Sequence, residues 1–335
     1  MKSIKFFIGP MTQNVIDSTI EFAEENNINF GFILTRRQID WNGGYVGYNT
    51  QDFIKYVRSR TDKILICRDH AGLYQGELSK ITGVVPTKYE DLYSMIQDAR
   101  EGVDIIHIDP WKKYPKFEQY ELGLNETINN IILINKINKQ IKFEIGTEEA
   151  IKPDKDNDLF RLLGDLEFEL GPIFNNIKYA VIQSGTKLEE TKNTGKFNLE
   201  RLQHMIKVCR DFNLLTKEHN GDYLTNDEIK IRFDNGLDAI NIAPEFGVIE
   251  TKVLIDHINN KKDLKKIYDI CLQSGDWKKW VDLSSFDPSK EKNNLIKICG
   301  HYHNKEIKNI VKMDDYAIKE IIKSKLNKLN NIIYK

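Results

Sequence analysis

The stretch Lys63–Gly72, "KILICRDHAG", begins as an unbroken apolar run and ends in charged residues around a histidine. A continuous run of branched apolar residues predicts a strand buried on both faces, as in a parallel sheet covered by helices. The stretch Leu214–Tyr223, "LLTKEHNGDY", makes the same change from apolar residues to charges around a histidine. Two such strands, far apart in the chain, predict a shared polar site where parallel strands end.

Eight apolar runs of this type recur along the chain, with starts roughly 25–40 residues apart, close to the repeat of roughly 31 residues in a (β/α)8 barrel. They are Lys5–Pro10, Asn29–Arg36, Ile64–Gly72, Val103–Trp111, Lys142–Glu149, Tyr179–Thr186, Leu214–Asp222 and Ala239–Phe246. Amphipathic helical patterns lie between them, for example at Val15–Asn26 and at Leu199–Phe212, which has Asn198 as its expected N-cap. No glycine-rich nucleotide-binding fingerprint follows any run. The sequence therefore predicts an α/β protein, with a (β/α)8 TIM barrel over residues 1–250 and a helical extension packed on it over residues 251–335.

The composition favours a globular protein of the cytoplasm. The chain has 335 residues, of which 40% are hydrophobic, and its formal net charge is -1. A near-neutral balance gives no reason to expect nucleic acid or a membrane surface as a partner. The four cysteines form no CxxC pair, which indicates a reducing compartment without a disulfide framework. No signal-peptide pattern and no apolar stretch of membrane-spanning length is present.

Histidines and carboxylates at the ends of the predicted strands indicate a metal site. In a barrel of this kind the site lies at the carboxyl ends of the strands. Two histidines, His70 and His219, together with a carboxylate predict a divalent metal site with an open position, with Zn²⁺ favoured. Glu144 and Glu148 are separated by an even number of residues, so both side chains can face the interior. We assign Glu144 to the metal and Glu148 to the catalytic residues, and the choice between these two glutamates stays open.

Three further features have two interpretations each. His107, in "IIHIDPW", has isoleucines on both sides, and a buried structural role and a site role are equally supported. Asp40–Phe53 contains three glycines and fits a mobile loop over the site and a turn-rich connector equally well. Cys299–His303, "CGHYH", fits no standard zinc spacing, and we interpret it as structural or partner-facing.

An ordered set of motifs between Ile8 and Glu250 resembles a known family. The motifs are "RRQIDWNGGYVGYNTQDF", "RDHAG", "IHIDPW", "EIGTEEAI" and "KEHNGDYLT". Together they resemble the so-called non-catalytic, or Z-type, subunit family of class II tagatose-bisphosphate aldolase. More distantly, the chain is similar to the catalytic class II fructose- and tagatose-bisphosphate aldolases, which are zinc-dependent (β/α)8 barrels.

The resemblance implies a metal-dependent lyase that acts on a sugar or sugar phosphate in carbohydrate metabolism. Asp69 and His70 match the Asp-His pair that supplies the proton-transfer acid and a zinc ligand in the aldolases. His219 matches a second zinc ligand, and Asn241 matches a substrate-binding asparagine. A phosphate or carboxylate of the substrate would be held by Arg36, Arg37 or Lys187, and we also count Lys187 among the catalytic residues. The expected substrate-binding residues are Arg36, Arg37, Gln183, Asp222, Asn241 and Glu245.

The chain departs from the aldolase pattern in two places. No histidine follows the sixth run, where only Gln183 and Lys187 are near, and a glutamate of the fifth run could take its place. The phosphate loop of the aldolases has here lost its serine and gained Asp222 and Tyr223, which suit hydroxyl groups better than a phosphate. Two alternatives therefore stay open. One is a non-catalytic partner that stabilises a separate aldolase subunit, and the other is a sugar epimerase or isomerase that uses the same enediolate chemistry. The chain could also form a homo-oligomer.

Overall fold

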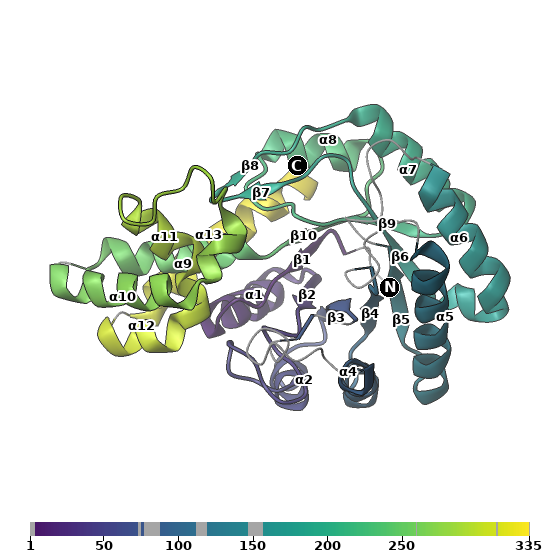
Figure 1. Ribbon diagram of the computed structural model, residues 1–335, viewed down its shortest axis with the longest axis horizontal. Coiled ribbons are helices and arrows are strands. Elements are labelled where there is room, and N and C mark those ends of the chain that lie inside the picture. The colour runs from purple at the N-terminus through teal and green to yellow at the C-terminus, as the bar shows by residue number, and fades with distance from the viewer. Residues whose placement is uncertain are drawn as a thin grey trace.

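The computed structural model describes residues 4–72, 75–76, 88–111, 119–146, 157–258, 260–312 and 314–334. Its centre is a closed barrel of eight parallel strands, which confirms the predicted fold class (Figure 1). In order around the barrel the strands are β1 (Phe6–Ile8), β2 (Phe30–Leu34), β3 (Ile64–Ala71), β4 (Ile105–Ile108), β5 (Lys142–Ile145), β6 (Ile177–Ile182), β9 (Leu215–Glu218) and β10 (Ala239–Ile242). The last strand pairs with the first, and each predicted apolar run overlaps one barrel strand.

Helices alternate with the strands and cover the outside of the barrel. They are α1 (Gln13–Asn26), α2 (Thr50–Arg58), α4 (Lys88–Glu101), α5 (Tyr120–Ile137), α6 (Asn157–Leu170), α7 (Leu199–Asp211), α8 (Asn226–Asp234) and α9 (Pro244–Asp256). The 3-10 helix η2 (Gly171–Asn176) precedes β6, and a hairpin of β7 (Leu188–Glu189) and β8 (Lys192–Asn193) follows it. The predicted N-cap Asn198 accepts a hydrogen bond from the amide of Arg201 at 2.9 Å. This bond satisfies one of the amides left unpaired at a helix start.

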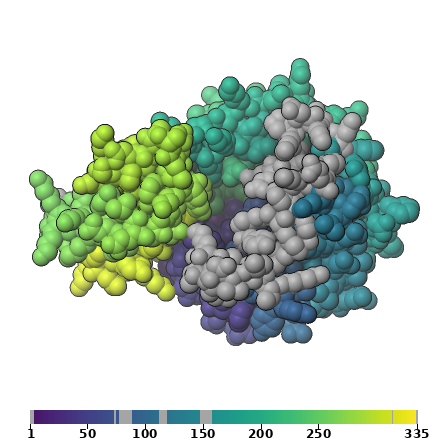
Figure 2. Space-filling model, in the orientation of Figure 1, coloured from purple at the N-terminus to yellow at the C-terminus, as the bar shows by residue number. Residues whose placement is uncertain are grey.

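The chain after β10 is helical, as expected. The elements are α10 (Lys261–Ser274), η3 (Asp276–Trp280), α11 (Lys292–Cys299), η4 (Gly300–His303), α12 (Asn304–Ile310) and α13 (Asp315–Tyr334). The segment from α10 to α12 forms a lobe beside the barrel (Figure 2). Helix α13 returns to the barrel and packs against α1, α8 and α9. The predicted boundary at residue 250 falls inside α9, and a division of the chain there stays a prediction. No described helix is long and apolar enough to cross a membrane.

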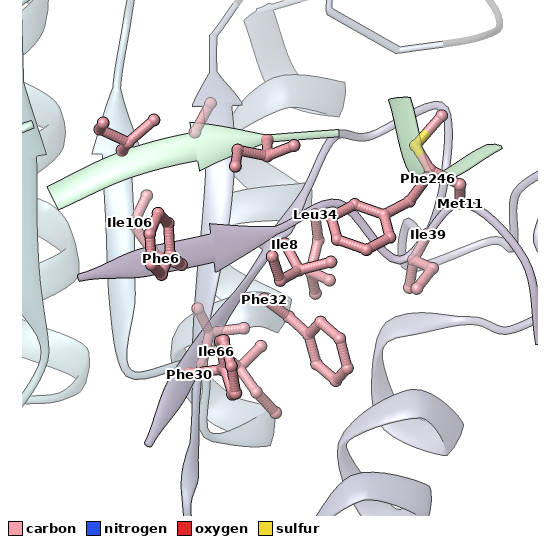
Figure 3. Close-up of a cluster of buried hydrophobic side chains, with 14 of the residues drawn as sticks. Phe6, Ile8, Met11, Phe30, Phe32, Leu34, Ile39, Ile66, Ile106 and Phe246 are labelled. Atoms are coloured by element: carbon pink, nitrogen blue, oxygen red, sulfur yellow. The ribbon is translucent and has the colours of Figure 1, made fainter. Parts of the chain in front are cut away.

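Side chains of the barrel strands form two separate layers. The larger layer lies between the sheet and the helices and includes Phe6, Ile8, Phe32 and Ile66 (Figure 3). The smaller layer fills the inside of the barrel and includes Phe7, Ile33, Cys67, Ile105, Tyr179 and Ala239. Residues alternate between these layers along each strand because successive side chains point to opposite faces. This alternation decides which residues reach the mouth of the barrel.

Candidate metal and active site

Inward-facing residues at the carboxyl ends of the strands form the candidate site. Residues two positions apart share a face of a strand. On β4, His107 lies two positions after the inner-layer residue Ile105 and so points into the barrel. On β9, His219 lies two positions after the buried Lys217, just past the end of the strand. On β3 the same step leads from the inner layer to Asp69. The barrel register therefore directs these side chains into one space.

His70 reaches the same space although it directly follows Asp69. In a regular strand two consecutive side chains point to opposite faces. The backbone of His70 has a φ of 48°, and the pairing of β3 with β4 shifts register between Arg68 and Ala71. A left-handed residue in an irregular strand end re-aims its side chain. This local irregularity allows both members of the Asp-His pair to serve one site.

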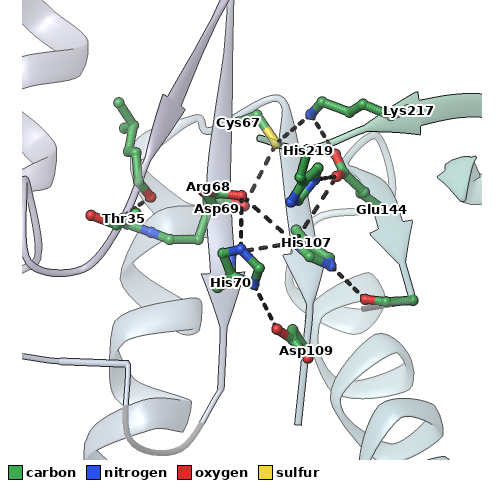
Figure 4. Close-up of polar contacts among 12 residues, drawn as sticks. Thr35, Cys67, Arg68, Asp69, His70, His107, Asp109, Glu144, Lys217 and His219 are labelled. Carbon is green, nitrogen blue, oxygen red and sulfur yellow. Dashed lines mark hydrogen bonds and ion pairs between the residues drawn. The ribbon is translucent and has the colours of Figure 1, made fainter. Parts of the chain in front are cut away.

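The four side chains form a compact cluster (Figure 4). Asp69, His70, His107 and His219 each offer one donor atom, and these atoms all lie within 4.8 Å of one another. The imidazole centroids are 4.8 Å apart for His70 and His107 and 5.2 Å apart for His219 and either of the others. Among the described residues this is the only group of such donors. We call these four residues the donor cluster.

Each imidazole of the donor cluster has one ring nitrogen held by an acceptor. The pairs are His70 Nδ1 with Asp109 Oδ2 at 2.6 Å, His107 Nε2 with the carbonyl of Gly146 at 2.7 Å, and His219 Nε2 with Glu144 Oε1 at 2.7 Å. A carbonyl oxygen or a carboxylate only accepts, so the held nitrogen carries the proton and the other nitrogen carries the lone pair. In agreement, Nδ1 of His107 accepts a hydrogen bond from the amide of His70 at 3.3 Å. Histidines that bind metals in proteins have one ring nitrogen fixed in this way, and a metal on Nδ1 of His107 would displace the 3.3 Å bond from the amide.

Asp69 completes the donor cluster with a carboxylate. The side chain is buried, and its Oδ1 has no hydrogen-bond partner among the described residues. This oxygen lies 3.8 Å from Nε2 of His70 and 3.7 Å from Nδ1 of His107. Burial opposes ionisation, but the imidazoles of His70 and His107, when protonated, hold the pKa of Asp69 well below its usual range. Three imidazole nitrogens around an unsatisfied buried carboxylate oxygen fit a divalent metal of the Zn²⁺ type.

Glu144 lies behind His219 rather than among the four donors. Its second oxygen, Oε2, accepts from Nζ of Lys217 at 2.6 Å, so both oxygens have partners. Both side chains are completely buried inside the barrel, where Nζ of Lys217 also lies 3.7 Å from the centre of the Phe7 ring. Burial would raise the pKa of Glu144, but Lys217 and His219 outweigh it and hold the pKa below its usual range. The two residues form an ion pair beneath the donor cluster.

The two neighbouring arginines have different surroundings. Arg36 is buried and binds three carboxylates, those of Asp40 at 2.8 Å, Glu90 at 2.9 Å and Asp91. Arg37 instead pairs with Asp276 of η3 at 3.0 Å. Its guanidinium lies 5.2 Å from the centre of the Tyr302 ring. Of the two, only Arg37 is directed toward the C-terminal lobe.

Two further predicted site residues, Asp222 and Glu245, lie outside the donor cluster. Oδ1 of Asp222 accepts from the amides of Ala243 and Glu245 at 2.9 and 2.8 Å and so caps the start of α9. Glu245 accepts from the amide of Tyr223 at 2.9 Å and pairs with Lys325.

Three more predicted residues have distinct environments, and one lies outside the described part of the chain. Gln183 accepts from the amides of Gly185 and Thr186, both at 2.8 Å, within its own turn. Lys187 is exposed and lies 3.6 Å from Glu189. Asn241 is buried at the end of β10, and neither of its amide atoms has a partner among the described residues. Glu148 lies outside the described residues.

His107 is the donor that reasoning from the sequence did not select. Its neighbours Ile106 and Ile108 pack in the outer layer between the sheet and the helices. The two isoleucines therefore show that the residue between them points inward, toward the axis of the barrel. His107 also stands opposite Glu144 in the register of β4 and β5. Strand alternation was the signal that could have identified it.

A pocket of about 280 Å³ opens beside Asp69 and His70. The loop after β2 contributes Arg37, and the C-terminal lobe contributes Lys279, Trp280 and Tyr302. Part of the glycine-containing stretch at residues 40–53 lies at this pocket. The amide of Tyr45 donates to the carbonyl of Arg37 at 3.1 Å, and the ring of Tyr45 also lines the pocket. A ligand in this pocket would contact the donor cluster at one side and basic side chains at the other.

Neither a family model nor a curated protein matches the chain. Solved structures do match its fold. A probable tagatose 6 phosphate kinase from Sinorhizobium meliloti 1021 aligns with 96% of this chain and 86% of its own, with a TM-score of 0.70 and 16% identity. The fructuronate-tagaturonate epimerase of Cohnella laeviribosi aligns over 99% and 81%, with a TM-score of 0.63 and 10% identity. The fructose-bisphosphate aldolase of Campylobacter jejuni aligns over 98% and 90%, with a TM-score of 0.57 and 12% identity. At these identities the likeness shows a shared barrel fold.

Proposed function

We propose that this protein is a metal-dependent lyase of the class II aldolase type, which forms or breaks a C–C bond of a sugar or sugar phosphate. One observation carries the proposal. Three histidines, each with one ring nitrogen held by an acceptor, surround the partnerless Oδ1 of Asp69 at the edge of a pocket. Metal-dependent barrel enzymes place their ligands and acid-base groups at this end of the strands.

His70, His107 and His219 would hold the metal, and Zn²⁺ is the favoured ion because imidazole nitrogens predominate. A bound divalent metal supplies a Lewis acid that polarises a carbonyl of the substrate. His107 of the fourth strand would take the place of the histidine that is missing after the sixth run. Glu144 and Asp109 would orient His219 and His70 through the hydrogen bonds that hold their protonated nitrogens.

Asp69 would move the proton at the oxygen of the carbon that becomes the aldehyde. It lines the pocket together with His70, so a substrate can approach it from that side. In the cleavage direction Oδ1 of Asp69 accepts the hydroxyl proton, and in the synthetic direction Asp69 returns it. Arg37 and Lys279 line the same pocket and would bind a phosphate or carboxylate at the other end of the substrate.

Metal analysis and a proton-exchange assay test the proposal together. The purified full chain is analysed for divalent metal and then incubated in D2O with hydroxyketone sugars and their phosphates. We expect about one metal per chain. Deuterium should enter the substrate at the carbon next to its carbonyl, and EDTA should abolish this exchange because the metal polarises the carbonyl. A chain that binds no divalent metal and exchanges no proton would refute the proposal.

The two alternatives give different results in the same experiment. The fold is shared with an epimerase as well as an aldolase, and both reactions can proceed through an enediolate. Product analysis separates them, because an aldolase yields two shorter fragments and an epimerase yields an isomer of equal mass. A non-catalytic subunit would show no exchange alone and would co-purify with a second barrel protein whose activity it raises.

A further inference from the structure

A second cavity, of about 380 Å³, lies next to the pocket at the donor cluster. Three segments line it: the start of α1, the loop around Gly47, and the residues from His301 to Lys308 of the C-terminal lobe. The two cavities share Met11 and Tyr45 as lining residues. The hydroxyl of Tyr45 lies 3.7 Å from the sulfur of Met11, so these two side chains form the wall between the cavities.

His301 is a buried polar group that lines this second cavity. It is 2% exposed, and neither ring nitrogen has a hydrogen-bond partner among the described residues. The ring packs against the backbone of α9 at Gly247, where a Cβ would lie 2.6 Å from Cγ of His301. Burial lowers the pKa of His301 to about 3, so the ring is neutral and offers one donor and one acceptor. Buried polar groups in folded proteins are nearly always paired, so the two ring nitrogens of His301 suit a polar ligand.

Two lysines of α12 stand at the same cavity. Lys305 and Lys308 are three positions apart and therefore share a face of the helix. Lys308 pairs with Asp315 at 2.8 Å and lies 3.7 Å from Glu250. Lys305 forms no ion pair with any residue that the structure describes. Its ammonium lies against Gly47, where a Cβ would be 2.6 Å from Nζ.

A buried acid beside the cavity, Glu250, already has several partners. Glu250 accepts hydrogen bonds from Asn14 and Asn304, both at 3.0 Å, and from the hydroxyl of Thr12. With Lys308 nearby, its charge is compensated inside the protein. The charge of Lys305 and the N–H of His301 remain for a ligand, and both are hydrogen-bond donors. Two donors, one of them cationic, favour an anion.

We propose that this cavity is a second binding site that takes a small oxyanion, a phosphate or a carboxylate group, between His301 and Lys305. The group can belong to either of two molecules. It can be the far end of the sugar substrate that extends past Tyr45, or it can be a separate anion that binds beside the substrate. The site does not depend on the activity proposed for the donor cluster.

Calorimetric titration of the full chain with inorganic phosphate tests the site. The wild-type protein should show saturable phosphate binding. His301→Phe keeps a ring in the same space and removes both nitrogens, and Lys305→Met removes the ammonium. Each should weaken phosphate binding about 10-fold or more, since each removes a hydrogen bond to a charged group. Lys312→Met, which removes the same charge from a position that does not line the cavity, should leave the affinity within about 2-fold.

The melting temperature shows whether each variant is folded. His301→Phe should melt at or above the wild-type temperature, because an apolar ring replaces an unpaired buried polar one. If this variant does not fold, the comparison of Lys305→Met with Lys312→Met decides alone. Absence of saturable phosphate binding, or equal binding by Lys305→Met and Lys312→Met, would overturn the proposal.

A second titration identifies the source of the anion. A ketose monophosphate that binds more tightly than phosphate, and loses that advantage both in Arg37→Met and in His301→Phe, is a single molecule that spans both cavities. If phosphate and the ketose monophosphate bind with equal affinity, and Arg37→Met does not change this, the bound group is a separate anion. Both results support an oxyanion site, and neither requires turnover, so the site can be judged even if the proposed lyase activity is absent.

Discussion

The carboxylate of Glu144 accepts a hydrogen bond from His219 at 2.7 Å while both side chains are buried inside the barrel. Its other oxygen is 2.6 Å from Lys217, which fills the barrel below. The three residues form a chain of charge-assisted contacts that leads from the barrel interior to the donor cluster. The orientation of one proposed metal ligand therefore depends on an ion pair that no solvent reaches.

Lys217→Met should destabilise the protein strongly. The substitution keeps the length of the side chain and leaves Glu144 as a buried charge without its cation. Removing one partner of a buried ion pair destabilises a protein by about 3–5 kcal/mol. Urea denaturation measures this loss. The double variant Glu144→Gln with Lys217→Met removes both charges and should recover most of it. A single variant as stable as the wild type would show that the pair does not hold the interior together.

Asp69→Asn should abolish turnover and leave metal binding nearly intact. It removes the proposed proton carrier but leaves His70, His107 and His219 in place. General acid-base groups contribute at least about 10²-fold to rates, so kcat should fall by about that factor. Metal content per chain and kcat are measured on the same preparation. Turnover at the wild-type rate would make Asp69 a structural residue.

Alanine at His70, His107 or His219 should lower metal occupancy in each case. Each substitution removes one imidazole donor, and each of these side chains lies at a strand end rather than in the packed apolar layers. Mutation of a residue that only hydrogen-bonds to a metal ligand reduces metal affinity by about 10–100-fold. Loss of a ligand itself should reduce the affinity further. His204→Ala, on the exposed face of α7, is the matched control. Full occupancy in all three variants would remove the proposed metal site.

The stability of the protein should fall as Asp222 ionises. Burial, together with the nearby Glu245, raises the pKa of Asp222 to about 7. The unfolded chain has an ordinary value of about 3.9, so between these values the folded state binds the extra proton. The stabilising contribution is full below the unfolded value and is lost as the pH rises through the folded value.

Asp222→Asn keeps an oxygen that can accept from the amides of Ala243 and Glu245. Its melting temperature should therefore fall less than that of the wild type between about pH 5 and about pH 8. Asp211→Asn, at the exposed end of α7, serves as the control and should follow the wild-type profile. Identical profiles for all three proteins would contradict a raised pKa at Asp222.

Arg36→Met should mainly reduce stability, and Arg37→Met should mainly weaken substrate binding. Arg36 compensates Asp40, Glu90 and Asp91, so its loss leaves buried carboxylates unpaired and should destabilise the fold by about 3–5 kcal/mol. Arg37 pairs with Asp276 at the pocket and is more exposed than Arg36, so its removal should destabilise the protein less. On the proposed function, it should raise KM about 10-fold for phosphorylated substrates alone. Denaturation and steady-state kinetics on the two variants separate these effects.

The barrel could be predicted from the sequence because its strands are buried on both faces and read as continuous apolar runs. Few other folds can bury eight such strands that alternate with amphipathic helices. Asp69, His70 and His219 could be selected as well, because they stand where those runs change to charged residues. Local patterns of hydrophobicity carry this information without knowledge of the tertiary structure.

The finer arrangement of the site depends on geometry that a single sequence does not contain. Strand alternation would place Asp69 and His70 on opposite faces, and only the left-handed backbone at His70 brings them together. Glu144 was expected to be a metal ligand. Its two oxygens instead contact His219 and Lys217, and Lys217 is 73 residues further along the chain. Arg36 and Arg37 have the same side-chain chemistry, and their different burial and carboxylate partners come from the tertiary structure.

Helix α13 lies on α1 through contacts such as that of Lys319 with Glu21, which are 298 residues apart in the chain. During synthesis on a ribosome, all eight strands emerge before Asp315 does. Until then the side of α1 that α13 covers stays exposed. In the same way, the edge of β1 that pairs with β10 stays unpaired until β10 has been synthesised. Contacts of such separation form late, because closing a long loop carries an entropic cost before any contact compensates it. The protein therefore reaches its native packing only after α13 has emerged from the ribosome, and it does not fold one β/α unit at a time.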